Sequence, residues 1–184
     1  MPHRLHIHPD ATSDAIERLV FDVRSDGGHR LAFVYRLDGE INRLNLDGCK
    51  SDGTQPDLWT STCFEVFLAA RPSDRYVEFN FAPDGRWAAY SFRDKRFGKR
   101  SVRRIASPRI GIQDNAESFE LTAHVDLTGL GFLTRARRWL LAPAAVIEDQ
   151  RGELSYWAAR HPAGRPNFHH DDCYAVEMKA GKRR

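Results

Sequence analysis

The feature that most restricts the fold of this 184-residue chain is an alternation of apolar and polar side chains at every second position. It runs through residues 30–37 (RLAFVYRL), 76–81 (YVEFNF) and 119–126 (FELTAHVD), and in each segment one set of alternate residues is apolar. Because successive side chains of a strand point to opposite faces, a period of two is typical of strands with a buried face. These segments predict a chain built mainly from β-strands.

Short turn sequences separate the predicted strands. Glycine follows aspartate at 26–28, 38–39 and 83–85, which suits the tight connections of antiparallel strands. Long helical patterns are missing, and residues 10–21 (DATSDAIERLVF) hold a modest candidate for a helical turn before a strand. Several short strands punctuated in this way predict an all-β fold, an antiparallel β-sandwich.

The middle of the chain predicts a three-stranded meander. CFEVFLA (63–69), RYVEFNFA (75–82) and RWAAYSF (86–92) are separated by a polar loop and a Pro-Asp-Gly turn. A second hairpin joins LLAPAAVIE (140–148) to ELSYWAAR (153–160). Both units predict antiparallel neighbours joined by short connections.

Composition fits a globular chain, since 41% of the residues are hydrophobic and 11% are aromatic. We expect a single domain over 1–178 and a basic C-terminal tail over 179–184. No apolar run approaches the roughly 18 residues of a membrane span, and the N-terminal sequence lacks the apolar core of a signal peptide. Cys49, Cys63 and Cys173 are widely separated, which fits reduced thiols in a cytoplasmic protein.

The formal charge of +3 hides a basic segment at 93–104 (RDKRFGKRSVRR), in which seven Lys and Arg residues accompany Asp94 alone. Basic clusters bind phosphates or nucleic acid electrostatically, but no nucleic-acid-binding motif accompanies this one. A solvated loop is the simpler interpretation, and docking of an acidic partner is the alternative. We expect no nucleic-acid or membrane partner, and the sequence leaves the oligomeric state open.

A polar row is predicted on one face of the meander. Residues two apart on a strand share a face, so Tyr76, Glu78 and Asn80 lie together, and Glu65 joins them if Phe64 faces the core. Such a face can hydrogen-bond a polar ligand, or it can be an ordinary wet sheet face with cross-strand pairs. The two glutamates could also form a glycosidase pair, which requires a defined separation of the carboxyl groups.

Tryptophans add a second signal beside this row. Trp59 lies in a polar loop just before the Glu65 strand, Trp87 begins the third strand of the meander, and Trp157 lies in the second hairpin. Trp139 precedes an apolar run and is expected in the core. Aromatic faces stack against the apolar faces of sugar rings, while carboxylate and amide groups bond the hydroxyls. Trp59 is the best candidate for such a platform.

The stretch HPAGRPNFHHDDC, which begins at His161, concentrates three histidines, two aspartates and a cysteine. One interpretation is a zinc site centred on His161, His169 and Asp171. A structural calcium at Asp171 or Asp172, or a haem, is a further alternative, although no HExxH, Cys2His2 or EF-hand spacing is present. The simpler prediction is a polar loop before a last strand at 173–178, with one histidine bonded to a backbone carbonyl.

Three longer segments, DLWTSTCFEVFL (57–68), YVEFNFAPDGRWAAYSF (76–92) and AVIEDQRGELSYWAARHPAGRPNFHHDDCYAVEM (145–178), follow one another along the chain. In order and spacing they resemble the bacterial DOMON-like proteins related to family 9 carbohydrate-binding modules. The resemblance covers most of the chain and implies a jelly-roll-like β-sandwich with a carbohydrate-binding role. Some relatives are joined to a UDP-N-acetylmuramate dehydrogenase, which implies amino-sugar or peptidoglycan metabolism.

The resemblance also implies a set of site residues. The tryptophan that stacks on the sugar matches Trp59, the glutamate of the following strand matches Glu65, and the asparagine of the Phe-Asn pair matches Asn80. A second aromatic clamp matches Trp157. The terminal pattern of the family is met by Trp157, Phe168, His169 and Tyr174. Asp171 stands where close relatives often carry proline, and the methionine–histidine pair of haem-binding relatives is not evident.

We therefore predict a non-catalytic module that binds a sugar or sugar derivative and needs no cofactor. The predicted ligand-binding residues are Trp59, Glu65, Glu78, Asn80, Trp87, Trp157 and His169. The alternative is a metal- or haem-binding protein, or a hydrolase, centred on His161, His169 and Asp171. Because no export signal is evident, a soluble sugar or a sugar nucleotide is expected rather than a polysaccharide.

Overall fold

The computed structural model describes residues 1–47 and 57–180, so Cys49 and the last four residues of the basic tail lie outside the described residues. The strands are β1 (His3–Ile7), β2 (Ile16–Ser25), β3 (Arg30–Gly39), β4 (Cys63–Ala69), β5 (Tyr76–Phe81), β6 (Trp87–Phe92), β7 (Arg100–Ser101), β8 (Arg109–Asp114), β9 (Ser118–Asp126), β10 (Arg138–Glu148), β11 (Leu154–Ala158) and β12 (Val176–Lys179). The helical elements are short: the 3₁₀ turns η1 (Ile41–Arg43), η2 (Leu58–Thr60) and η3 (Asp171–Cys173), and α1 (Gly131–Thr134).

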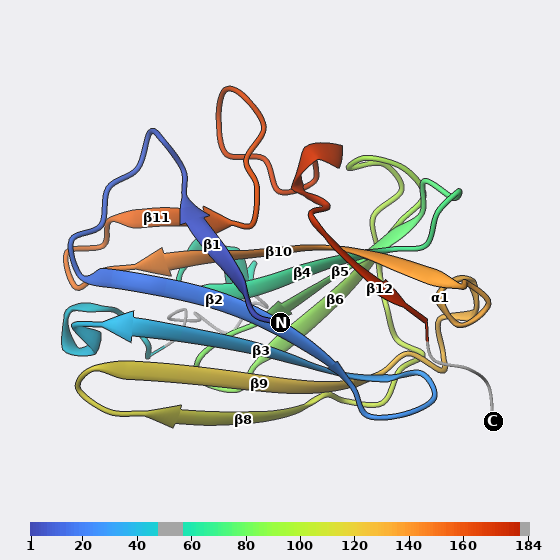
Figure 1. Cartoon of the computed structure of the whole chain (residues 1–184), viewed down its shortest axis with the longest axis horizontal. Coiled ribbons are helices and arrows are strands. Elements are labelled where there is room, and N and C mark those ends of the chain that lie inside the picture. The colour runs from blue at the N-terminus through green and yellow to red at the C-terminus, as the bar shows by residue number, and fades with distance from the viewer. Residues whose placement is uncertain (48–56, 181–184) are drawn as a thin grey trace.

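The strands form two layers of an antiparallel β-sandwich, which confirms the predicted fold class. They follow the order β7-β6-β5-β4-β10-β11-β1-β2-β3-β9-β8, with β12 paired to β10. β2, β3, β9 and β8 lie in one layer, and β6, β5, β4 and β10 lie in the other (Figure 1). β1 connects the layers, because its first residues pair with β2 and its last two pair with β11.

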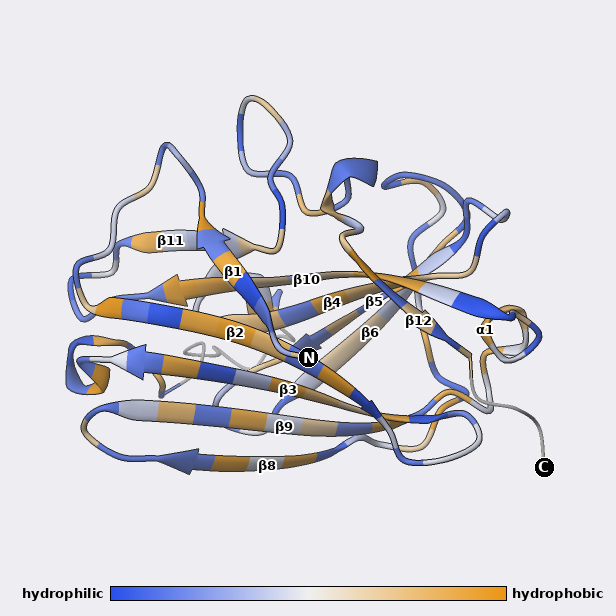
Figure 2. Ribbon diagram, in the orientation of Figure 1, coloured by the Kyte–Doolittle hydropathy of each residue, from blue (hydrophilic) through white to orange (hydrophobic). Residues whose placement is uncertain are grey.

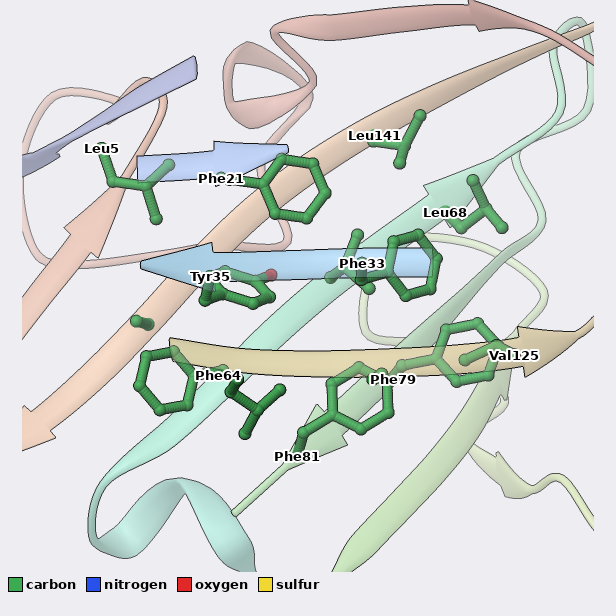
Figure 3. Close-up of a cluster of buried hydrophobic side chains, with 14 of the residues drawn as sticks. Leu5, Phe21, Phe33, Tyr35, Phe64, Leu68, Phe79, Phe81, Val125 and Leu141 are labelled. Atoms are coloured by element: carbon green, nitrogen blue, oxygen red, sulfur yellow. The ribbon is translucent and has the colours of Figure 1, made fainter. Parts of the chain in front are cut away.

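The main core lies between the two layers (Figure 3). The ring of Phe33 on β3 lies 6.1 Å from the ring of Phe79 and 6.3 Å from that of Phe81, both on β5. The ring of Tyr35 lies 5.2 Å from that of Phe64 on β4. Figure 2 shows the alternation of hydrophobic and hydrophilic residues along β9, and each second residue there is buried. Full burial of such side chains contributes about 1.5–3 kcal/mol each.

The opposite face of the β4–β5 layer is buried as well. Every residue of β4 and β5 is buried, because segment 159–175 returns across this face. Phe168 and Cys173 of that segment share a second apolar cluster with Phe67 and Tyr76 of the two strands. The ordinary wet sheet face that the sequence allowed is therefore not formed, and the predicted polar row lies under a cover.

Several local predictions can be compared with the fold. β4–β5–β6 confirm the meander, and β10–β11 confirm the second hairpin. The helical turn considered within 10–21 is wrong: the Glu40 N–H donates to the Ala15 carbonyl, and the chain continues from there into β2. The last strand starts at Val176, three residues after its predicted start, because Asp171–Cys173 form η3 instead. Among the described residues, no helix has the length and apolar character to cross a membrane.

Candidate functional site

A cavity of about 550 Å³ lies on the outer face of β4 and β5, bounded by segment 159–175. Its polar and charged lining consists of Glu65, Glu78, Arg96, Lys99, Arg165 and His169. Its apolar and aromatic lining consists of Trp59, Phe92, Val146, Tyr156, Pro166 and Phe168. Three predicted site residues besides His169, namely Trp59, Glu65 and Glu78, are thus brought together.

The strand register brings the two glutamates into this cavity. Glu65 pairs with Asn80, and Phe67 pairs with Glu78, so alternate side chains of β4 and β5 share the outer face. On the other side of β4, Glu65 pairs with Ala144 of β10, whose side chain is small. The predicted placement of both glutamates and the asparagine on one face is confirmed.

The two carboxyl groups form a buried floor. Glu65 and Glu78 are 4% and 5% exposed, and burial raises the pKa of both, with the charge of Glu78 raising that of Glu65 further. Asn80, predicted as a ligand contact, is 1% exposed and instead donates from Nδ2 to Glu78 Oε1 at 2.6 Å. Glu65 Oε1 is buried without a hydrogen-bond partner among the described residues. A buried oxygen without a hydrogen bond costs about 1–3 kcal/mol of folding free energy. A hydrogen bond from a ligand hydroxyl to Glu65 would remove this cost.

His169 is held in the cavity by a short chain of hydrogen bonds. The Arg96 backbone N–H donates to Tyr76 Oη at 3.0 Å, and that hydroxyl lies 2.8 Å from His169 Nδ1. Burial, together with the charges of Arg96 and Lys99, lowers the pKa of His169 to about 4, so the ring is neutral at pH 7. When Tyr76 donates to Nδ1, the ring proton is on Nε2, which lies 3.8 Å from Glu78 Oε2. His169 then presents an N–H donor to the cavity floor.

Trp59 forms an exposed edge of the cavity. It belongs to η2, which is anchored by buried Leu58 and closed by two bonds from Thr60 to the Asp57 carbonyl, at 3.0 Å from the backbone N–H and 2.8 Å from Oγ1. The Trp59 side chain is 46% exposed, in contrast to the buried aromatic residues of the core. An indole left open beside polar groups offers a flat apolar surface to a ligand. The indole therefore lies within reach of a ligand that occupies the cavity.

The structure places Trp87 and Trp157 on the opposite side of the sheet. Trp87 pairs with Phe81 and packs against the core between the layers. Trp157 is buried in that core and donates from Nε1 to Ser155 Oγ at 2.9 Å. Strand alternation directs both indoles away from the cavity, which corrects the prediction that they line its rim. Trp139 is fully buried, as predicted.

Several lining residues were not predicted as site residues. Tyr156 precedes Trp157 on β11, so the same alternation that sends the indole inward sends the Tyr156 ring to the cavity face. Arg96 and Lys99 belong to the basic segment 93–104, for which a solvated loop was the simpler interpretation. Period-two reasoning could have found Tyr156, whereas the two cations reach the cavity only because their loop folds back beside β5.

The residues of the predicted metal site do not converge. His161 Nε2 lies 2.8 Å from a backbone carbonyl oxygen of β1, which confirms the simpler prediction for one histidine. Asp171 forms ion pairs with Arg71 at 2.8 Å and Lys95 at 2.6 Å. His169 faces the cavity instead. Across residues 1–47 and 57–180, no group of three His, Cys, Asp or Glu side chains is placed to hold a metal ion, so the common site predicted for His161, His169 and Asp171 is not formed.

The β-sandwich is similar in fold to solved structures of family 9 carbohydrate-binding modules, the fold that the sequence resemblance implied. A proposed carbohydrate-binding protein from Bacteroides uniformis superposes with a TM-score of 0.67 and 13% identity over 97% of this chain and 85% of its own. A family 9 module from Caldicellulosiruptor kristjanssonii in complex with glucose superposes with a TM-score of 0.54 and 12% identity, over 95% of this chain and 81% of the module. A family 9 module from the same organism in complex with cellotriose superposes with a TM-score of 0.50 and 12% identity, over 99% of this chain and 84% of the module.

At sequence identities of 12% and 13%, these similarities show the fold alone. No protein-family model matches the chain, and no curated protein matches its sequence. Because a fold does not determine a ligand, the function depends on the residues that line the cavity.

Proposed function

We propose that this protein is a non-catalytic carbohydrate-binding module whose ligand, a sugar or sugar derivative, occupies the cavity over β4 and β5. The observation that carries the proposal is the combination of an exposed indole, Trp59, with two buried carboxyl groups, Glu65 and Glu78, in one cavity. A sugar ring has an apolar face and a rim of hydroxyls, so it matches a site that offers both kinds of surface.

Each lining group has a distinct role in this proposal. Trp59 stacks on the apolar face of the ring, and the Glu65 and Glu78 oxygens accept hydrogen bonds from hydroxyls. The His169 Nε2–H donates to a hydroxyl or ring oxygen. Asn80 acts as a positioning residue, because its amide is bonded to Glu78 and does not line the cavity.

The fold comparison supports the proposal, because the Caldicellulosiruptor kristjanssonii modules of this fold are described in complex with glucose and cellotriose. The narrower relationship to DOMON-like proteins, some joined to a UDP-N-acetylmuramate dehydrogenase, is part of the proposal and would place the ligand among amino sugars. A cytoplasmic location and a soluble ligand belong to the same proposal.

The test is a titration of the purified protein with glucose, cellotriose, N-acetylglucosamine and N-acetylmuramic acid, followed by calorimetry and tryptophan fluorescence. We expect Trp59→Ala to abolish the ligand-induced fluorescence change and to lower affinity about tenfold, which corresponds to loss of one aromatic stacking contact. The melting temperature should change by less than about 2 °C, because the indole is exposed.

Phe97→Ala is the matched control, since it removes a 68% exposed aromatic side chain outside the cavity lining. It should leave affinity unchanged. A Trp59→Ala variant that binds like the wild type, or that melts far earlier, would contradict the stacking role. Failure of the wild type to bind any of these sugars or any charged derivative of them would contradict the proposed function.

A further inference from the structure

The mouth of the cavity is basic although its floor is acidic. Arg96, Lys99 and Arg165 line the same cavity as Glu65 and Glu78, and all three cations are exposed to solvent. The first two lie in the loop between β6 and β7, and the third lies between β11 and β12. Two segments that are far apart in the sequence therefore bring positive charge to one opening.

The two arginines at the mouth have no charged partner in the described part of the chain. Some other surface arginines, such as Arg24 and Arg36, form ion pairs with an aspartate two residues away. Arg96 Nη2 instead donates to the neutral amide oxygen of Asn167 at 3.0 Å. Within residues 1–47 and 57–180, neither Arg96 nor Arg165 forms an ion pair. Unpaired guanidinium groups at a cavity mouth are available to an anion.

The carboxyl groups of the floor balance only part of the positive charge at the cavity mouth. Lys99 and Arg96 oppose the burial that raises the pKa of Glu78. Burial also raises the pKa of Glu65 well above its usual range, which favours the uncharged carboxyl. The floor therefore carries less negative charge than two carboxyl groups would in water, and one of the three cations, Lys99, is paired with Asp57 at 3.8 Å. Arg96 and Arg165 are thus the two cations of the opening that form no ion pair with the described residues.

A second hollow continues the cavity past the two arginines. It has a volume of about 400 Å³, shares Arg96, Arg165 and Pro166 with the cavity, and adds Asn167 and His170. Arg96 and Arg165 therefore line open space both in the cavity and in the second hollow. A ring seated on the cavity floor has room for a substituent that reaches them.

We propose that the ligand of this cavity is an anionic sugar, with its ring over Glu65 and Glu78 and its carboxylate or phosphate bound by Arg96 and Arg165. This inference rests on the proposed function and narrows its class of ligand. Guanidinium groups bind carboxylate and phosphate oxygens through paired, charge-assisted hydrogen bonds, whereas a neutral sugar offers them no opposite charge. Lys99 lies at the same opening, where its ammonium group is paired with Asp57 at 3.8 Å.

The experiment compares matched ligands by calorimetry: glucose with glucuronate and glucose 6-phosphate, and N-acetylglucosamine with its 6-phosphate. Inorganic phosphate is titrated alone. We expect at least one anionic ligand to bind about tenfold or more tightly than its neutral parent, as one or two charge-assisted hydrogen bonds provide. This advantage should shrink when the ionic strength is raised from about 50 mM to about 300 mM, because the groups are exposed.

Two variants locate the effect. Arg165→Gln should lower the ratio of anionic to neutral affinity about tenfold, since it removes one guanidinium group from the cavity mouth. Arg103→Gln removes the same charge from an exposed position of the basic segment that does not line the cavity, and it should leave the ratio unchanged. Melting curves of both variants check that they are folded.

Each contrary result has a definite meaning. Neutral sugars that bind as tightly as their anionic partners would overturn this inference and leave the proposed function standing. Equal loss in Arg165→Gln and Arg103→Gln would show a long-range charge effect rather than a contact, and would also overturn it. So would inorganic phosphate that binds as tightly as the sugar phosphates. If no sugar of either kind binds, the inference and the proposed function both fail.

Discussion

Glu65 occupies a position that folding alone does not favour. Its Oε1 is buried without a partner in the described residues, and burial resists the ionisation of its carboxyl group. Buried polar groups are normally hydrogen-bonded, so an exception at the floor of a cavity indicates a group held ready for a ligand. Glu78 differs, because Asn80 already satisfies one of its oxygens.

Glu65→Gln is expected to become more stable than the wild type as pH rises. The pKa of Glu65 is higher in the folded protein than its ordinary value of 4.5, so the folded state holds this proton more tightly than the unfolded state. Wild-type stability from this group is complete below pH 4.5 and is lost as pH increases, whereas glutamine does not titrate. Urea unfolding between pH 4.5 and about 8 should show a widening difference in unfolding free energy. A difference that narrows with pH would contradict the assignment.

At the scale of the element, segment 159–175 closes the cavity through a few side-chain contacts. Phe168 is buried against the outer face of the sheet, and His169 is bonded to Tyr76. His8 Nε2 of the N-terminal segment lies 2.9 Å from the Gly164 carbonyl oxygen. A segment held in this way opens at a lower free energy than the paired strands beneath it.

Tyr76→Phe is expected to loosen this segment and to lower the free energy of unfolding by about 1 kcal/mol. The substitution removes a hydroxyl that bonds both His169 and the Arg96 backbone. Amide hydrogen exchange followed by mass spectrometry should rise in 159–175 and stay constant in β2 and β3.

Tyr174→Phe is the matched control from the covering segment. The Tyr174 hydroxyl is buried without a partner among the described residues, so its removal should be neutral or stabilising. Equal increases of hydrogen exchange in the Tyr76 and Tyr174 variants would show that the Tyr76 hydroxyl does not hold the segment.

At the scale of the whole molecule, the core and the cavity share β4 and β5. Phe64 and Phe79 point into the core from these strands, while Glu65 and Glu78 point to the cavity. The packing between the layers therefore sets the plane of the cavity floor. Phe33 on the opposite layer is central to this packing, since it contacts rings on β2 and β5.

Phe33→Ala is expected to lower the free energy of unfolding by about 3–5 kcal/mol, because it leaves a void between the two layers. Phe97→Ala, which truncates an exposed ring, should change it by no more than about 0.5 kcal/mol. Denaturant unfolding measures both. A loss below about 1 kcal/mol for Phe33→Ala would show that the contact between the layers is not what holds the fold together.

The alternation in the sequence was sufficient to predict the strands and to place Glu65 and Glu78 on one face, because strand pleating is a local property of the backbone. It also predicted the meander and the second hairpin, while the polar residues around Trp59 made this tryptophan the best candidate for a stacking platform. Local patterns could not show that this face is covered, since the cover includes a histidine 93 positions away from its Tyr76 partner.

Other features of the site depend on long-range packing. From the sequence alone, Trp87 and Trp157 could be either ligand contacts or core residues. The packing of the sandwich determines which side of each strand faces the core. Arg96 meets Asn167, 71 positions later, only because the two loops fold over the same strands. Short-range sequence thus decides which residues share a face, while the packing of distant segments decides which face is buried, which is open and which charges meet there.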